Sequence, residues 1–237
     1  MIPMKLIPIC EHADSLIILA MARKMNIKFN QIRKKKIITQ AKYEEQQGRC
    51  GYCEANLLDK DGNLSSKCVH LDHFHQQCLC DELKFSWNNL ILSCNSPNSC
   101  GYYKDTPRQK ISSSDIFNPH NTSEDPREHF VFIEEKSGEV SIQPVRNSTL
   151  FQKAKNTIDA LHLDFIDLRE KRGSELAKFK PTIDQLVFDV TECLLQGNDI
   201  TLFQSFFDEL LDDIENGAHP SAILSYAKNQ LSGLLHV

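Results

Sequence analysis

The sequence predicts an α+β protein in which a small cysteine-rich centre lies between two helical regions. Three observations support this prediction. Seven of the nine cysteines fall between positions 50 and 100, short strand-like apolar runs and turn signals follow in 50–146, and apolar residues after position 146 recur at helical spacing. We therefore divide the chain into a basic helical N-terminal region (1–49), a cysteine-rich centre with a hairpin extension (50–146) and a helical C-terminal region (147–237).

The composition is that of a globular protein. The chain has 237 residues, of which 41% are hydrophobic and 25% charged. Its longest apolar run (16–22) has seven residues, against roughly 20 needed to cross a bilayer, and no secretory leader pattern opens the chain. We expect a cytoplasmic protein with no membrane partner. Since the cysteine count is odd, the sequence favours metal binding over a disulfide framework.

The N-terminal region carries strong local positive charge in a chain whose net charge is −5. Between positions 23 and 49, nine residues are basic and two are acidic. The basic run at 33–36 within this stretch fits either a solvated helix face or a phosphate contact. Its position beside the candidate site favours phosphate. The residues expected to contact nucleic acid here are Lys34, Lys35, Lys36 and Arg49.

Two cysteine pairs form the clearest chemical pattern. Cys50 and Cys53 form a C-x-x-C knuckle, and Cys94 and Cys100 follow as a second pair with five residues between them. A C-x-x-C pair lets two thiolates reach one tetrahedral Zn²⁺, and no βαβ pattern indicates a redox dithiol. We predict that the four cysteines hold a structural Zn²⁺ while 95–99 bulges outward. A competing set of ligands is Cys68, Cys78 and Cys80 with His70. We interpret these cysteines as ordinary thiols, with a second zinc site as the alternative.

An acidic residue, a histidine and an asparagine lie between the two pairs. Asp72 directly precedes His73, and Asn89, followed by leucine, comes sixteen positions later. This order resembles the HNH, or ββα-metal, nuclease family over about 50–110. Over about 45–175 it is similar to Septu-type (PtuB-like) and retron-associated HNH proteins. That wider likeness rests on Gln47-Gly48-Arg49-Cys50-Gly51-Tyr52-Cys53-Glu54, Trp87-Asn88-Asn89-Leu90-Ile91-Leu92-Ser93-Cys94, Asn118-Pro119, Asp125-Pro126 and 157–169.

Phosphodiester hydrolysis requires residue types of this kind. An imidazole that titrates near ~6.5 is largely neutral in cells and can take a proton from water, so we expect His73 to be the general base. The Asp72 carboxylate is a hard ligand for a catalytic Mg²⁺ or Mn²⁺, and Asn89 is expected to bond across the loop and hold the base. Adjacent strand residues point to opposite faces. Asp72 and His73 can therefore act on one phosphate only if the backbone there is irregular or the metal lies at the edge of the strand. The resemblance implies such a geometry.

The helix ligand is where this chain departs from the family. The resemblance implies Asn or His directly after the last zinc cysteine, and this chain has Gly101 there. Asp105, one helical turn further on, is the first candidate to replace it as a ligand of the divalent cation, and Asn98 is another. Lys104 is similar to a lysine often found in this helix, and we expect it either to contact phosphate or to remain solvated.

A hairpin and a set of helices are predicted downstream. Strands at 130–133 and 140–142 flank a Ser-Gly turn. Ser148 or Thr149 is expected to cap a helix that runs to 161, a second helix covers 164–178, and Pro181 starts a third. Two further helices cover 202–214 and 222–235. From 189 to 218 there are eight acidic and no basic residues, a surface that suits solvent or a protein partner rather than phosphate.

The resemblance implies a metal-dependent HNH endonuclease or nickase acting on DNA and leaving a 3′-hydroxyl and a 5′-phosphate, although the residues alone do not separate DNA from RNA. It also implies a bacterial anti-phage system in which an ABC-type ATPase (PtuA-like) subunit controls the nuclease, with the acidic helices of 189–217 as the expected docking surface. The alternative is a non-catalytic zinc module that binds nucleic acid or a protein. Gly101 supports this alternative, because it offers no side chain at the position of the helix ligand.

Overall fold

The structure, a computed structural model, combines helices with two small antiparallel sheets, the α+β class predicted from the sequence. It describes residues 13–25, 28, 35–64, 68–77, 80–107, 109–121 and 123–234. The helices and strands are α1 (Ala13–Lys24), α2 (Lys35–Glu45), β1 (Val69–His73), β2 (Leu90–Cys94), α3 (Cys100–Lys104), β3 (Phe130–Glu134), β4 (Val140–Pro144), α4 (Phe151–Leu161), α5 (Ile166–Leu195), α6 (Thr201–Asn216) and α7 (Pro220–Leu231).

The first sheet pairs β1 with β2 and carries the candidate site. The strands are antiparallel, with Val69 opposite Cys94 and His73 opposite Leu90. The Gln46 side chain, just after α2, donates to the Leu92 carbonyl at 2.7 Å and accepts from the Leu92 amide at 2.8 Å. The Leu92 carbonyl also accepts the Gly51 amide at 3.0 Å, so both the end of α2 and the cysteine knuckle are held to the edge of β2.

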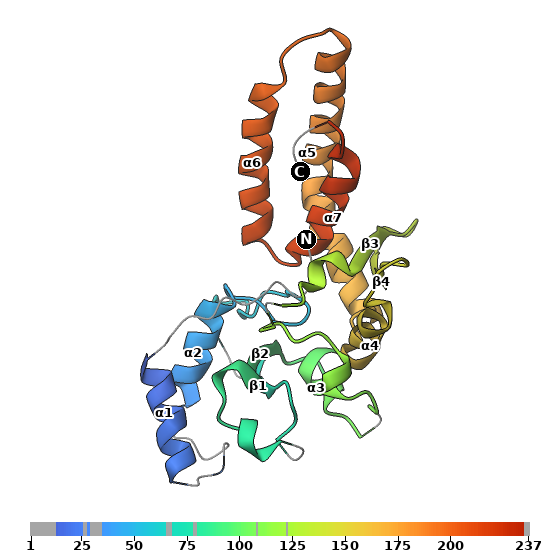
Figure 1. Cartoon of the computed structure of the whole chain (residues 1–237). Helices are drawn as coiled ribbons and strands as arrows, with labels where there is room; N and C mark the ends of the chain where they lie inside the picture. The colour runs from blue at the N-terminus through green and yellow to red at the C-terminus, as the bar shows by residue number, and fades with distance from the viewer. Residues whose placement is uncertain are drawn as a thin grey trace.

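The second sheet is the predicted hairpin, in which β3 pairs with β4. Helices α4, α5 and α7 pack against it (Figure 1). The contact with α5 is so close that a Cβ on Gly173 would lie 2.1 Å from the Gly138 carbonyl oxygen in the hairpin turn. Only glycine fits there. At the start of α4, Ser148 lies two residues before the N-cap, Leu150, and its Oγ accepts the Leu150 amide at 3.0 Å.

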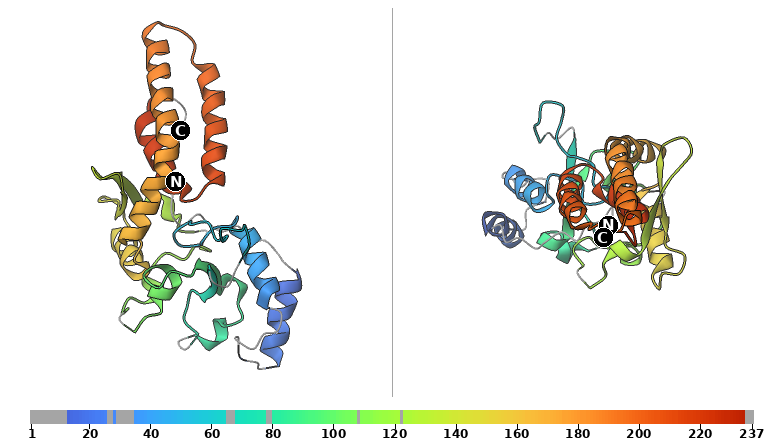
Figure 2. Two further views of the ribbon diagram at one scale, coloured as in Figure 1. Left: turned by 180° about the vertical axis from the view of Figure 1, so that it is seen from behind. Right: turned by 90° about the horizontal axis from the view of Figure 1, so that it is seen from above.

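Helix α5 is one helix of 30 residues, so the prediction of two helices separated before Pro181 is wrong. Proline lacks an amide hydrogen and its ring crowds the preceding turn, which usually ends or bends a helix. Here the helix continues because side chains on both sides of the proline, such as Leu176 and Ile183, are buried. The later half of α5 and α6 extend together away from the β1–β2 end of the molecule (Figures 1 and 2).

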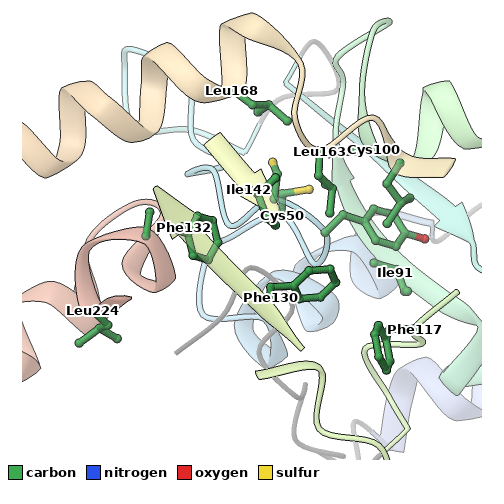
Figure 3. Close-up of a cluster of buried hydrophobic side chains, with 14 of the residues drawn as sticks. Cys50, Ile91, Cys100, Phe117, Phe130, Phe132, Ile142, Leu163, Leu168 and Leu224 are labelled. Carbon is green, nitrogen blue, oxygen red and sulfur yellow. The ribbon is translucent and has the colours of Figure 1, made fainter. Parts of the chain in front are cut away.

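One apolar core joins the cysteine-rich centre to the hairpin and the C-terminal helices. Cys50 and Cys100 belong to the same buried cluster as side chains from β2, the hairpin, α5 and α7. The packing therefore crosses the boundary expected at position 146. Figure 3 shows part of this cluster, including Ile91, Phe117, Phe130, Phe132, Ile142, Leu163, Leu168 and Leu224.

Polar contacts attach the end of α6 and the start of α7 to the cysteine knuckle. The Arg49 guanidinium donates to the carbonyl oxygens of Glu215 at 2.5 Å and Gly217 at 3.2 Å. The buried Glu54 carboxylate accepts the Ser221 amide at 3.2 Å and the Ser221 hydroxyl at 2.7 Å. It therefore caps the first turn of α7, where amides lack partners within the helix. In the part of the chain described, no helix combines the length and the apolarity needed to cross a bilayer.

Candidate functional site

The four predicted zinc cysteines come together. Cys50 and Cys53 lie in the turn after α2, Cys94 ends β2 and Cys100 begins α3. Their Sγ atoms all lie within 4.8 Å of one another, and the cluster is mostly buried. Among the described residues, this is the one group of three or more Cys, His, Asp or Glu side chains that could hold a metal ion. Cys68 and Cys80 lie outside it, and Cys78 lies outside the described residues.

The cluster fits a structural metal such as zinc. A tetrahedral Zn²⁺ with Zn–S bonds of about 2.3 Å places neighbouring sulfurs about 3.8 Å apart, and the Cys53 and Cys94 Sγ atoms are 3.8 Å apart. The Cys94 amide donates to the Cys50 Sγ at 3.3 Å, a bond that stabilises a thiolate. Burial raises the pKa of the Cys100 thiol, whereas hydrogen bonds from the other three thiols outweigh burial and lower the pKa of the Cys50 thiol. Ionisation of all four thiols together therefore favours a bound cation.

Asp72 lies near the end of β1 and faces α3. Its side chain is only 2% exposed, and Oδ2 accepts a hydrogen bond from the Tyr52 hydroxyl. The His70 Nε2 lies 4.0 Å from Oδ1. Burial raises the pKa of the Asp72 carboxyl to about 7, against the opposing charge of Lys104. The sequence pattern did not identify Tyr52 as a partner of Asp72. The one available signal is a large aromatic residue inside a C-x-x-C turn.

Gly101 provides the space that Asp72 occupies. A Cβ on Gly101 would lie 2.7 Å from the Asp72 Cγ and 2.9 Å from the His70 Nε2. Both distances are far shorter than normal van der Waals contact, so a larger residue would displace one of these side chains. The position where the resemblance implies a metal ligand is therefore filled, from the strand side, by a carboxylate.

Lys104 links the two carboxylates predicted to bind the catalytic cation. Its Nζ lies 2.6 Å from the Asp105 Oδ1 and 3.4 Å from the Asp72 Oδ2, and it donates to the His73 carbonyl oxygen at 2.9 Å. The Lys104 side chain is 4% exposed. In this conformation its ammonium binds protein acceptors, not the solvent or phosphate expected from the sequence.

His73 follows Asp72 and points to a different set of neighbours. Its Nε2 lies 3.0 Å from the Lys84 carbonyl oxygen. Because a carbonyl oxygen only accepts, this bond assigns the hydrogen to Nε2 and leaves the lone pair on Nδ1. The Gln77 amide donates to Nδ1 at 3.2 Å from the exposed side of the loop after β1. The imidazole is 5% exposed, so Nδ1 can accept a proton from a water where the Gln77 amide gives way.

Asn89 holds the loop that follows His73. Its side-chain oxygen accepts the His75 amide at 2.7 Å, and its side-chain nitrogen donates to the His75 and Leu83 carbonyl oxygens, both at 3.1 Å. The Leu83 contact reaches the residue before Lys84, whose carbonyl oxygen bonds the imidazole. Asn89 therefore fixes, through the backbone, both ends of the segment that orients His73.

The basic residues expected to contact nucleic acid have different environments. Arg49 is 8% exposed and holds the end of α6, which differs from the phosphate contact expected of it. Lys36 is exposed near the start of α2. Lys34 lies outside the described residues. Lys35 is the first residue of α2, and only its backbone is described.

A cavity of about 820 Å³ connects Lys36 with the neighbourhood of Asp72. It lies between α2, the loop at 59–64 and the β1–α3 face, and its lining includes His70 and Tyr102. These two rings meet edge to face with their centroids 4.8 Å apart. The cavity thus combines an exposed ammonium, polar side chains and an aromatic ring beside the candidate site.

Comparisons with known proteins do not add a relative: no protein-family model matches the chain, and no curated protein matches it. The argument for function therefore rests on the residues and their geometry.

Proposed function

We propose that this chain is a metal-dependent HNH endonuclease or nickase that hydrolyses phosphodiester bonds of DNA. The observation that carries the proposal is the His73 imidazole, held at Nε2 by the Lys84 carbonyl oxygen at the end of a strand whose partner strand ends in a cysteine of the four-cysteine cluster. A fixed neutral imidazole is suited to take a proton from an attacking water. Asn89 keeps the supporting loop in place.

The order of elements also supports an HNH centre. Two antiparallel strands, β1 and β2, are followed by α3, and the four cysteines connect the knuckle, the end of β2 and the start of α3. In the proposal these cysteines bind a structural Zn²⁺. Asp72 and Asp105 would hold Mg²⁺ or Mn²⁺, which when bound supplies a Lewis acid for the phosphoryl and leaving oxygens.

The N-terminal side of the site offers a path for nucleic acid. Lys36 lies in the first turn of α2, where the positive end of the helix dipole adds to the ammonium charge. The cavity below it leads to Tyr102, which is 50% exposed and presents a ring on which a base can stack. A strand lying across this cavity would pass the first half of β1 and bring its backbone to His70, whose Nε2 lies 4.0 Å from the Asp72 Oδ1.

We further propose that the chain is the effector of a Septu-type or retron-associated anti-phage system and that an ABC-type ATPase (PtuA-like) subunit docks on its C-terminal helices. A groove of about 710 Å³ lies between α5 and α6, with Leu186 and Phe203 in its lining and Asp189 and Glu209 at its rim. Apolar side chains with acidic neighbours suit a protein surface that is apolar and basic.

The groove is connected to the candidate site through the fold. Helix α6 ends at the carbonyl oxygens that Arg49 binds, and α7 begins at the Glu54 carboxylate. Arg49 and Glu54 flank the C-x-x-C knuckle. Movement of α6 and α7 on binding a partner would therefore be transmitted to the cysteine cluster, which gives the ATPase a physical route to control the nuclease.

A plasmid-nicking assay with Mg²⁺ or Mn²⁺, run with and without the ATPase, tests the nuclease proposal. His73→Ala should reduce the nicking rate by at least about 100-fold, the usual contribution of a general base. His75→Ala is the matched control, because its ring bonds Ser113 and lies outside the proposed chemistry. Equal nicking by the wild type and His73→Ala, with zinc content unchanged, would refute the role of His73.

Substitution in the groove tests docking without removing helices. Leu202 and Phe206 are 79% and 46% exposed and line the groove, so Leu202→Asp with Phe206→Asp should abolish capture of the ATPase while leaving the fold intact. Ile133→Asp, on β3 and 39% exposed, is the control. Truncation near residue 180 is less informative, because it removes the part of α5 and the α7 contacts that support the knuckle.

Two specific observations favour a second function. The Lys104 ammonium lies between the two carboxylates, and Gly101 offers no ligand. Both features fit a zinc module that binds nucleic acid or a protein without cutting. Tight DNA binding without nicking, with the ATPase and either metal present, would favour this function.

A further inference from the structure

We infer that Lys104 is an internal cation that occupies the place of a divalent metal between Asp72 and Asp105, so that metal can load only when this side chain withdraws. The inference rests on the proposed function only in taking the two carboxylates as the metal site. It adds the claim that Lys104 competes with the metal for this site.

The Lys104 ammonium is fully coordinated by the protein. A protonated lysine has three N–H donors and no acceptor. Three oxygens lie within reach of Nζ: the Asp105 Oδ1 at 2.6 Å, the His73 carbonyl oxygen at 2.9 Å and the Asp72 Oδ2 at 3.4 Å. These acceptors come from the end of β1 and from the residue that follows α3. The ammonium therefore binds the same carboxylate pair that a divalent ion would need.

An ammonium and a divalent ion cannot both occupy this place. Lys104 is 4% exposed and Asp72 is 2% exposed, while Asp105 is 45% exposed. Water therefore reaches the Asp105 side of the pair but screens little of the repulsion between two cations held against Asp72. The Tyr52 hydroxyl already donates to the Asp72 Oδ2, and the space above Gly101 is filled by Asp72 and His70. A metal bound by both carboxylates therefore requires Nζ to leave.

Substrate supplies a reason for the lysine to leave. A phosphodiester oxygen at the site offers the ammonium an anion to pair with outside the carboxylate pair. Lys104 sits in the last turn of the short helix α3, at the end near the loop after β1, so its side chain can swing from the carboxylates toward a phosphate. Nucleic acid and metal should then bind cooperatively, because each favours the withdrawn lysine.

Binding of Mn²⁺ to the zinc-loaded protein, followed by paramagnetic resonance of the free ion, tests the inference. Lys104→Met removes the competing charge with a side chain of similar length, and we expect at least a tenfold lower Kd for Mn²⁺. Lys110→Met, at an exposed lysine outside the site, should leave the Kd unchanged. Adding Asp105→Asn to Lys104→Met should reverse the gain. Equal Kd values in the wild type and Lys104→Met would overturn the inference.

A measurement on the wild-type chain covers the case in which Lys104→Met fails to fold. An amine-acylating reagent, with sites read by mass spectrometry, should leave Lys104 unmodified without Mn²⁺ and label it at saturating Mn²⁺. Lys110 should be labelled in both conditions. Saturating Mn²⁺ with Lys104 still protected, or no detectable Mn²⁺ binding in any variant, would overturn the inference. Neither readout depends on cleavage, so both measurements test the role of Lys104 even if the protein never nicks DNA.

Discussion

The two candidate cation sites meet at the start of α3, and they differ in what balances their charge. Cys100 belongs to a cluster of four thiols that lie within 4.8 Å of one another. Its neighbour Gly101 packs against Asp72, whose carboxylate is paired with the ammonium of Lys104. Ionisation of all four thiols of the cluster requires a cation added from outside. The carboxylate pair already has a cation from the chain.

This difference separates two roles of metal in one small centre. A cluster that needs an outside ion makes that ion part of the folded structure. A carboxylate pair that already has one ammonium beside it does not depend on an outside ion for folding, so under our proposal an added ion competes with Lys104. The predictions below test this distinction, beginning with the largest expected effect.

The thiol cluster should be required for folding. Structural zinc contributes on the order of 10 kcal/mol to the folding of small zinc domains, so we expect Cys94→Ser to lose zinc and lower Tm by more than about 10 °C. Metal content and differential scanning calorimetry measure both effects. Cys68→Ser is the control, because this thiol lies outside the cluster. A normal Tm in zinc-free Cys94→Ser would end the distinction between the sites.

The carboxylate site should respond to added volume without losing zinc. In Gly101→Ala the new Cβ would lie 2.7 Å from the Asp72 Cγ, and overpacking of this kind costs about 2–3 kcal/mol. Urea unfolding measures the cost. Asp72→Ala combined with Gly101→Ala should cost less than the sum of the single substitutions, because the alanine at position 72 removes the contact with the Asp72 Cγ, while the contact with the His70 Nε2 remains. Additive costs would show that Asp72 is not what fills the space.

A third cluster provides a fully internal ion pair for comparison. Lys42 is buried 2.8 Å from Glu45, and its Nζ lies 3.3 Å from the His120 Nε2. Burial and the nearby lysine lower the pKa of His120 to about 3. Between this value and about pH 6.5, the unfolded chain binds more protons at this histidine than the folded protein does. Stability contributed by His120 is therefore complete above pH 6.5 and is lost as the pH falls.

His120→Gln should remove that part of the pH dependence. Between pH 7.5 and pH 5.5, the unfolding free energy of the wild type should fall by about 1.4 kcal/mol more than that of the variant. This value follows because pH 5.5 lies one unit below the pKa of histidine in the unfolded chain. Urea unfolding at several pH values measures the difference. A constant difference between the two proteins would show that His120 titrates normally in the folded state.

Local patterns in the sequence predicted the elements that are determined locally. The C-x-x-C spacing and the second cysteine pair predicted a cluster that the structure contains, and the Ser-Gly turn predicted the β3–β4 hairpin. Pro181 misled the prediction of α5, because a local preference against helix is outweighed by burial of Ile183 and Leu186. Such burial is set by tertiary packing, which spacing along the chain does not encode.

The partners of the candidate site residues could not be predicted for the same reason. Asp72 and Lys104 meet because β1 lies against α3, and Tyr52 reaches Asp72 from the knuckle. Arg49 was grouped with the basic residues by charge, yet its guanidinium binds carbonyl oxygens at the end of α6. Sequence identified which residue types were available. Which charge each one neutralises depends on contacts between distant segments.

The contacts of Arg49 and Glu54 with the C-terminal segment have a consequence for synthesis of the protein. Arg49 and Glu215 are 166 residues apart in the chain, and Glu54 and Ser221 are 167 apart. Such contacts form late, because the intervening chain must first be made and ordered. A ribosome-bound chain that ends before α7 lacks the support of its cysteine knuckle. We therefore expect the cysteine knuckle of a nascent chain to remain without this support until α7 has been translated.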